Sequence, residues 1–209
     1  MGLRRNSSLV HAGGCCETFW VSRAYGTCRL RNRRRCTLHR RGQSETVSDN
    51  QRFTAADICR LHRLWLSPIY AWSGEYRTVN LGKGGFQFAN AALIPAFMEE
   101  LERKVLQQYT PCLAAPDEAI AEALAAVQAE LILVHPFRDG NGRVARLLAL
   151  LMGLQAGLPP LDFSSLDGRG KRHYIAGIHA AMGHDYSTLI GMFRRVIDRT
   201  WKRVSSNNR

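Results

Sequence analysis

The apolar residues of this chain recur at helical spacing in several separate segments between residues 52 and 204. Apolar positions three and four residues apart lie on one face of a helix and bury that face in a core. The pattern predicts helices over about 55–65, 93–108, 117–134, 143–156, 171–182 and 186–204. The fourth of these is apolar almost all round, which predicts a central position. We therefore expect an all-α fold, a mainly helical bundle.

One segment follows a different pattern. Two β-prone stretches, residues 76–81 and 86–88, flank the four residues Gly82, Lys83, Gly84 and Gly85. This arrangement predicts a small β-hairpin turned by glycines. An exposed hairpin edge can accept an extended peptide as an extra strand, although a purely structural hairpin would have the same pattern.

The first 43 residues show neither helical nor alternating periodicity. They hold ten of the 29 basic residues and one of the 17 acidic residues, so the rest of the chain has 19 basic and 16 acidic residues. We expect residues 1–45 to be a disordered or artefactual Arg/Cys-rich segment and residues 46–209 to be one domain. A basic tail, an organelle transit peptide and a reading-frame artefact are the three interpretations of the segment.

Charge and composition narrow the class of protein. The net charge of +12 comes mostly from the N-terminal segment; the near-balanced body argues against nucleic-acid binding. No apolar run approaches the roughly 18 residues of a membrane helix, and no apolar run of a secretory signal follows the first arginines. Cys28, Cys36 and His39 do not have the spacing of a standard zinc site. We expect a cytoplasmic protein with reduced thiols.

The residues with chemical potential are concentrated in His135–Arg146, HPFRDGNGRVAR. A buried helix delivers His135 to its end, and Gly140-Asn141-Gly142 makes a turn before the next helix begins. The N-terminus of that helix offers free N–H groups and a positive dipole to an anion. Arg143 and Arg146 lie one turn apart, where both can face a phosphate. Asp139 is a candidate Mg²⁺ ligand.

Each of these features alone is commonly structural, but their combination between two apolar helices favours a site. The segment matches every fixed position of the signature His-x-Phe-x-(Asp/Glu)-Gly-Asn-Gly-Arg-x-x-Arg and so resembles the Fic family. The resemblance extends from about residue 52 to residue 204. It includes Gly-Glu-Tyr-Arg at 74–77 and the loop at 83–86, which is similar to the target-binding flap of the family.

The resemblance implies a Fic-like helical bundle with a hairpin flap and the activity of a protein adenylyltransferase, which transfers AMP from ATP to a Tyr, Thr or Ser hydroxyl of a target protein. His135 would be the general base, and its titration is expected near neutrality. Asp139 would hold Mg²⁺. The nucleotide would contact Gly140, Asn141, Gly142, Arg143, Arg146 and Tyr174, and the target would contact Lys83, Gly84, Gly85 and Phe86. Phe137 would pack in the core.

The chain departs from the pattern of the family in two respects, and two alternative functions are open. Met182 stands where some relatives have a polar nucleotide contact, and we find no inhibitory (Ser/Thr)-x-x-x-Glu-(Gly/Asn) segment. Two explanations would account for the missing inhibitory segment: a separate antitoxin-like partner inhibits the protein, or the inhibitory region was lost upstream of residue 52. The alternative functions are a Doc-like kinase or other phosphate-group transferase on the same fold and an inactive nucleotide-binding module.

Overall fold

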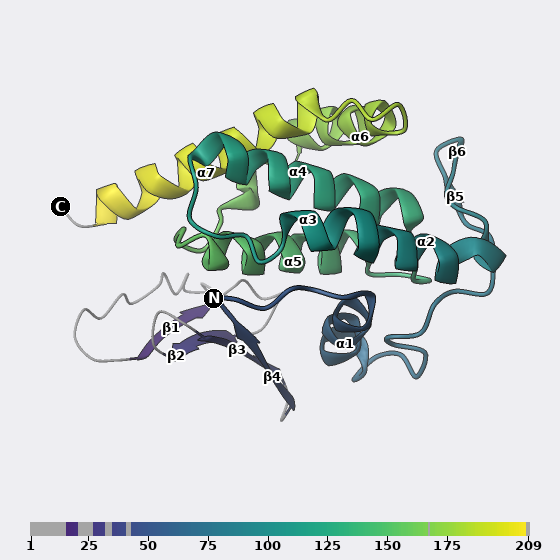
Figure 1. Ribbon diagram of the computed structural model, residues 1–209, viewed down its shortest axis with the longest axis horizontal. Helices are drawn as coiled ribbons and strands as arrows, with labels where there is room; N and C mark the ends of the chain where they lie inside the picture. Colours follow the sequence, from purple (N-terminus) through teal and green to yellow (C-terminus); the bar gives the residue numbers. More distant parts are fainter. Residues whose placement is uncertain (1–15, 21–26, 32–34, 41–42, 167, 208–209) are drawn as a thin grey trace, which may run out of the picture.

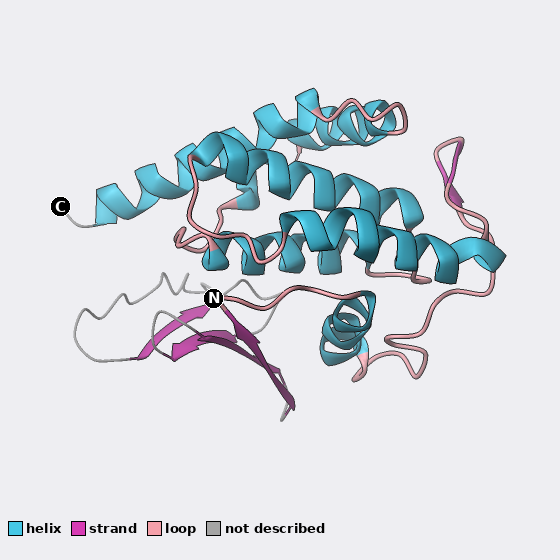
Figure 2. Cartoon of the chain, viewed as in Figure 1, coloured by secondary structure: helices cyan, strands magenta, loops and turns pink. Residues whose placement is uncertain are grey.

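The computed structural model describes residues 16–20, 27–31, 35–40, 43–166 and 168–207. Within these residues, helices form a bundle and two antiparallel sheets lie at its margins (Figures 1 and 2). The α-helices are α1 Ala55–Leu66, α2 Ile94–Leu101, α3 Gln107–Tyr109, α4 Asp117–Val134, α5 Asn141–Gln155, α6 Arg169–Ala181 and α7 Ser187–Asn207. The expected all-α bundle with a small hairpin is confirmed.

Helices α4 and α5 form the centre of the bundle and run in opposite directions (Figure 1). Three alanines of α4 at intervals of four residues, Ala121, Ala125 and Ala129, are fully buried. Small side chains in this register let neighbouring helices approach closely, while Leu124 and Leu148 fill the space between them. The loop between the two helices carries the candidate site, so tight central packing fixes its two ends.

Helix α1 begins with a capping box. Thr54 accepts a hydrogen bond from the backbone N–H of Asp57, and the Asp57 carboxylate accepts one from the backbone N–H of Thr54. These bonds satisfy N–H groups that a helix start would otherwise leave unpaired. The helix packs against α5 and presents buried His62 toward the loop that follows α4.

The segment predicted as one helix over 93–108 is helical but not uniform. A short 3-10 turn, Ala91–Leu93, leads into α2, and a π-helical turn, Glu102–Leu106, separates α2 from α3. Such a turn contains one more residue per hydrogen-bonded ring than an α-helix, which changes the face that later residues present. The apolar spacing of the sequence gives no sign of this change.

The predicted hairpin exists but is shorter than expected. Its strands are β5 Gly82–Lys83 and β6 Phe86–Gln87, which pair antiparallel. Residues 76–81, expected to form a strand, are not one, because this stretch is held by the buried side chain of Arg77 instead. Figure 1 shows the hairpin at the end of the bundle away from the N-terminal sheet.

The described parts of the N-terminal segment form a four-stranded antiparallel sheet, which the sequence did not lead us to expect. Its strands are β1 Cys16–Trp20, β2 Thr27–Arg31, β3 Arg35–Arg40 and β4 Gln43–Ser48. The expectation of a disordered segment therefore differs from the structure in these strands, while the possible metal ligands Cys28, Cys36 and His39 lie where side chains are not described. The domain boundary at residue 45 stays a prediction. Val47 of β4 is buried in the helical core.

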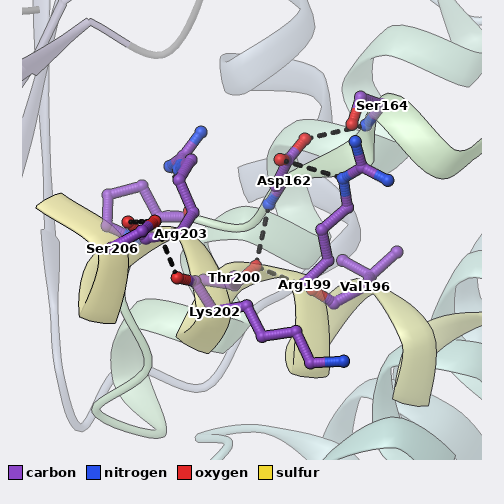
Figure 3. Close-up of polar contacts among 9 residues, drawn as sticks. Asp162, Ser164, Val196, Arg199, Thr200, Lys202, Arg203 and Ser206 are labelled. Atoms are coloured by element: carbon purple, nitrogen blue, oxygen red, sulfur yellow. Dashed lines mark hydrogen bonds and ion pairs between the residues drawn. The ribbon is translucent and has the colours of Figure 1, made fainter.

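Helix α7 is fixed to the segment that follows α5 (Figure 3). The Thr200 hydroxyl accepts a hydrogen bond from the Asp162 N–H and donates one to the Val196 carbonyl. Arg199 contacts the Asp162 carboxylate, and the Arg203 guanidinium donates to the Pro160 carbonyl. Among the described helices, none is both long enough and apolar enough to cross a bilayer.

Candidate active site

His135 ends α4 in a left-handed conformation, with φ 51° and ψ 58°. Its backbone N–H donates to the Leu131 carbonyl, and its ring Nδ1 lies 3.1 Å from the Ile132 carbonyl oxygen. Because a carbonyl only accepts, Nδ1 carries the proton, and Nε2 is the nitrogen with the free lone pair. The end of α4 therefore fixes both the tautomer and the orientation of the imidazole.

The His135 ring is half-buried beneath the hairpin. Phe88 stacks on it with ring centroids 3.6 Å apart and an angle of 14°. Burial lowers the pKa of His135 to about 4, the positive charges of Arg77 and Lys83 act in the same direction, and the Ile132 hydrogen bond and Asp139 oppose them. The expectation of titration near neutrality is therefore wrong for the ligand-free site, where the imidazole is neutral at pH 7.

Asn141 holds the loop between α4 and α5 closed. Its side-chain oxygen accepts from the backbone N–H of Phe137 at 2.9 Å, and its amide donates to the Phe137 carbonyl at 2.7 Å. The side chain is 2% exposed, and both of its polar atoms are occupied by this one residue. The side chain therefore shapes the loop, and the contact of Asn141 with a nucleotide stays a prediction. Phe137 is fully buried, as predicted.

His62 supports the same loop from α1. Its Nδ1 accepts from the Gly74 N–H at 2.8 Å, so its Nε2 carries a proton and donates to the Asp139 carbonyl at 2.9 Å. The ring stacks on Phe137 at 3.7 Å. Burial lowers the pKa of His62, which keeps this tautomer neutral. One buried imidazole thus joins two loops distant in sequence.

Two glycines with different surroundings stand at the first turn of α5. Gly140 precedes it with φ 83°, and a Cβ there would meet Leu66 at 2.7 Å and His62 at 3.2 Å. Gly142, inside the turn, is exposed, and a Cβ there would meet no heavy atom within 4 Å. Because the N–H groups of the first turn lack acceptors within the helix, an anion could reach them through the space beside Gly142.

The charged residues of the site lie around this turn. Arg143 forms an ion pair with Asp139, and its guanidinium lies 4.3 Å from the centre of the Trp65 ring. Both members of the pair are partly exposed, so solvent screens the attraction and a competing ion can separate them. Arg146 is half-buried one turn further along α5. The structure thus brings the predicted carboxylate together with the Arg143 guanidinium at the start of α5.

Arg77 joins the hairpin to His135. Its guanidinium donates to the carbonyl oxygens of Val79 and Ala89, which stand on either side of the hairpin, and to that of His135 at 2.8 Å. Its backbone N–H donates to the Pro136 carbonyl. At 1% exposure, this is one of the largest fully buried side chains. A single cation therefore positions both stems of the flap against the end of α4.

Tyr174 is the predicted nucleotide contact that comes from α6 and not from the segment between α4 and α5. Its hydroxyl accepts a hydrogen bond of 2.7 Å from Gln128, a buried residue of α4 located seven residues before His135. The two side chains link α6 to α4. Met182, in contrast, is 62% exposed just beyond the end of α6.

A magnesium ion is the one metal that the resemblance implies. Among the described residues, no group of three or more His, Cys, Asp and Glu side chains could hold a metal ion. Mg²⁺ commonly binds one or two carboxylates together with substrate phosphates. The half-exposed Asp139 carboxylate beside the first turn of α5 fits that type of ligand set.

Four residues of the site were not anticipated from the sequence: Arg77, His62, Phe88 and His179, the last of which contacts the hairpin. A signal existed for His62, which interrupts the apolar face of α1, and for Arg77, which ends the recognised Gly-Glu-Tyr-Arg segment. The two aromatic contacts join segments that are distant in sequence, and no local pattern indicates them.

The fold and the loop define a helical domain with a glycine turn at the start of a central helix and a hairpin over the preceding histidine. The model of the Fic/DOC family matches residues 52–152. A probable protein adenylyltransferase of Sinorhizobium fredii is 32% identical over 145 residues, which cover 66% of this chain and 69% of that protein. The chain belongs to the Fic/DOC family.

Other relatives match over a smaller share of their own length. The protein adenylyltransferase Fic of Nematostella vectensis is 29% identical over 161 residues, which are 75% of this chain but 35% of that protein. The probable protein adenylyltransferase Fic of Salmonella typhimurium is 33% identical over 104 residues, 48% of this chain and 50% of that protein. The chain thus matches about half or less of these two relatives.

Solved structures agree on the fold. The crystal structure of BepC from Bartonella tribocorum, with bound AMPPNP, has a TM-score of 0.57 at 24% identity and covers 70% of this chain and 75% of that one. A Fic-domain signaling protein from Bacteroides thetaiotaomicron has a TM-score of 0.56 at 24% identity and covers 73% and 62%.

Proposed function

We propose that this chain is a protein adenylyltransferase that transfers AMP from ATP to a hydroxyl side chain of another protein. The observation that carries the proposal is the neutral His135 imidazole, whose Nε2 is available as a base beside the glycine turn that opens α5. Relatives named as protein adenylyltransferases share the family of this chain.

In the proposed reaction the target hydroxyl oxygen attacks the α-phosphorus of ATP. The bond from that phosphorus to the oxygen bridging to the β-phosphorus breaks, and pyrophosphate leaves. The hydroxyl proton passes to Nε2 of His135. Ile132 holds the opposite ring nitrogen at 3.1 Å, which keeps Nε2 in the accepting form. A bound triphosphate would raise the pKa of His135, because negative charge stabilises the imidazolium.

The first turn of α5 would bind the phosphates. The backbone N–H groups of Asn141 and Gly142 lie in that turn, and Arg143 and Arg146 would offset the charge on departing pyrophosphate. Arg143 must exchange part of its contact with Asp139 for a phosphate oxygen. We propose that Asp139 would hold Mg²⁺, which would supply positive charge against the negative charge that develops on the phosphates.

The target would bind along the hairpin. Lys83, Gly84 and Gly85 are exposed at its tip, so their backbone groups can pair with an extended segment. Phe86 is partly exposed beside them. Pairing of this kind would bring a hydroxyl side chain toward the imidazole under Phe88 without requiring one particular target sequence.

The decisive experiment compares ATP labelled at the α- or the γ-phosphate. The protein, Mg²⁺ and each form of ATP are incubated with a cell lysate, and labelled acceptors are identified by mass spectrometry. We expect label only from the α-position and a mass increase of one AMP on a Tyr, Thr or Ser. Label from the γ-position alone would instead identify the Doc-like phosphotransfer reaction.

Replacement of His135 separates catalysis from binding. We expect His135→Ala to lose AMP transfer by at least about 100-fold, the usual contribution of a positioned base, and to retain ATP binding because the phosphate-binding turn is unchanged. Equal labelling by the variant would refute the proposed base. ATP binding without transfer in both proteins would favour the inactive nucleotide-binding module.

Compartment and regulation complete the proposal. Cys59 and Cys112 are free thiols, which fits the cytoplasm that we propose as the site of the reaction. The chain contains no recognised inhibitory segment, so we propose that a separate antitoxin-like protein restrains it. Co-purification from the native source with a small partner that suppresses labelling is the expected result.

A further inference from the structure

The hairpin β5–β6 has little intrinsic stability. Each strand contains two residues, and the tip from Gly82 to Gly85 is exposed. Isolated two-stranded ribbons are marginal in water, so the position of this hairpin depends on its attachments to the bundle. At the stems that attachment is Arg77, whose guanidinium binds carbonyl groups on both sides.

Nearer the tip, the attachment is aromatic. Phe86 of β6 stacks on His179 of α6, with ring centroids 4.8 Å apart and an angle of 11°. Phe86 also meets Phe88 edge to face at 5.2 Å and 71°. Since Phe88 lies flat on His135 at 3.6 Å, four rings connect the last turn of α6 with the proposed base.

The order of the rings matters. Phe88 covers one face of the His135 imidazole and helps to keep water from it. Phe88 is oriented by its edge contact with Phe86, and Phe86 is oriented in turn by His179. His179 is exposed and lies three ring contacts from the base. It has no role in the helical core, so its ring contact with the hairpin is the feature that requires an explanation.

We propose that His179 is a positioning residue: by stacking on Phe86 it docks the flap on α6 and thereby keeps Phe88 over the ring of His135. This rests on the proposed function, because the base and the target edge of the flap are what the docking positions. The flap is then in place before a target binds, and less ordering remains for the target segment to accomplish.

Three variants of α6 test the docking without any assay of activity. His179→Ala removes the ring, His179→Phe keeps an aromatic ring, and His173→Ala removes the other exposed histidine of the same helix. Trypsin cleavage after Lys83 and amide hydrogen exchange of residues 82–88 report how often the flap opens. Thermal unfolding establishes that each variant is folded.

We expect His179→Ala to speed cleavage and exchange by roughly two- to tenfold, the range that an aromatic pair supports. His179→Phe and His173→Ala should behave as wild type. Cleavage of His179→Ala at the wild-type rate would overturn the docking, whatever the enzyme does to its substrates.

Ring NMR of His135 tests the second link. Arg77, Lys83 and Asp139 are the charged groups that influence this ring, and none is altered in the three variants. Loss of the Phe88 cover in His179→Ala should raise the pKa of His135 toward its ordinary value, and His179→Phe should restore the low value. An unchanged His135 titration in a variant whose flap has loosened would overturn the link to the base.

A kinetic measurement uses the acceptor protein that is identified with ATP labelled at the α-phosphate. We expect His179→Ala to raise the KM for that acceptor and leave ATP binding unchanged, with rescue by His179→Phe. If no acceptor is labelled by the wild type, the adenylylation proposal fails, yet cleavage and NMR still decide the docking. Normal kinetics in a variant with a loosened flap would refute the positioning role.

Discussion

Gly140 and Gly142 stand two residues apart but meet different surroundings. Gly140 has φ 83° and faces Leu66 and His62, whereas a Cβ at Gly142 would enter open space. We expect Gly140→Ala to lower the free energy of unfolding by about 1–3 kcal/mol, because the backbone conformation is strained for alanine and the space is filled. Urea unfolding of the two alanine variants measures the contrast.

Gly142→Ala should leave stability unchanged or slightly increased, because alanine is the better helix former. Its methyl group would occupy the space through which a phosphate approaches the first turn of α5. We expect ATP affinity to fall on the order of tenfold, about 1.4 kcal/mol. A Gly142→Ala variant that binds ATP as tightly as wild type would argue against phosphate binding at this turn.

The pKa of His135 provides a second test at the same scale. Without ligand it is about 4 because the ring is buried near Arg77 and Lys83. A triphosphate at the α5 turn adds negative charge that favours the imidazolium, so a non-hydrolysable ATP analogue should raise the pKa. Ring NMR checks this, with an Arg143→Gln, Arg146→Gln double variant as the control in which the shift should be lost.

Single residues were predictable where one sequence segment contains the whole feature. His135, Asp139 and the two arginines are within twelve consecutive residues, and Asp139 and Arg143 form an ion pair. The role of Asn141 in closing the loop was missed, since both of its partners are backbone atoms of Phe137. The low pKa of His135 was missed because it arises from residues of the hairpin, 47 or more positions earlier in the chain.

At the scale of elements, the hairpin depends on Arg77. We expect Arg77→Lys to lower the free energy of unfolding by about 1–3 kcal/mol, because lysine cannot reach all the carbonyl groups and leaves some unpaired. AMP transfer should fall, because the two stems of the flap lose hydrogen bonds from the Arg77 side chain. Arg138→Lys is a suitable control, since Arg138 is exposed and its guanidinium donates a long hydrogen bond of 3.5 Å to the Thr78 hydroxyl.

Helices were predictable because their apolar spacing is local. The π-helical turn at Glu102–Leu106 was not, because the same apolar spacing suits either helix. The prediction of a strand over residues 76–81 was wrong. These β-prone residues form a loop, in which the Arg77 side chain donates a hydrogen bond to the Val79 carbonyl. Side-chain contacts overrode local propensity.

At the scale of the whole molecule, the N-terminal sheet joins the bundle through a few contacts. Val47 of β4 is 4% exposed within the helical core. The Gln155 amide, at the end of α5, donates to the carbonyl oxygens of Ser48 and Gln51 at 3.1 and 2.9 Å. Among the side chains that the structure describes, these contacts with the core lie C-terminal to the Arg-rich stretch, which shows no apolar periodicity and whose strands we did not expect.

This arrangement predicts different outcomes for two truncations. Removal of residues 1–42 leaves Val47 and both acceptors of Gln155, so AMP transfer and the free energy of unfolding should change little. Removal of residues 1–51 takes away a buried valine and two hydrogen bonds, together worth roughly 3–5 kcal/mol. That is a large share of the stability of an ordinary domain, about 5–15 kcal/mol. Urea unfolding and α-label transfer measure both proteins. If the shorter truncation were as damaging as the longer one, strands β1–β3 would belong to the folded unit, and the boundary near residue 45 would be wrong.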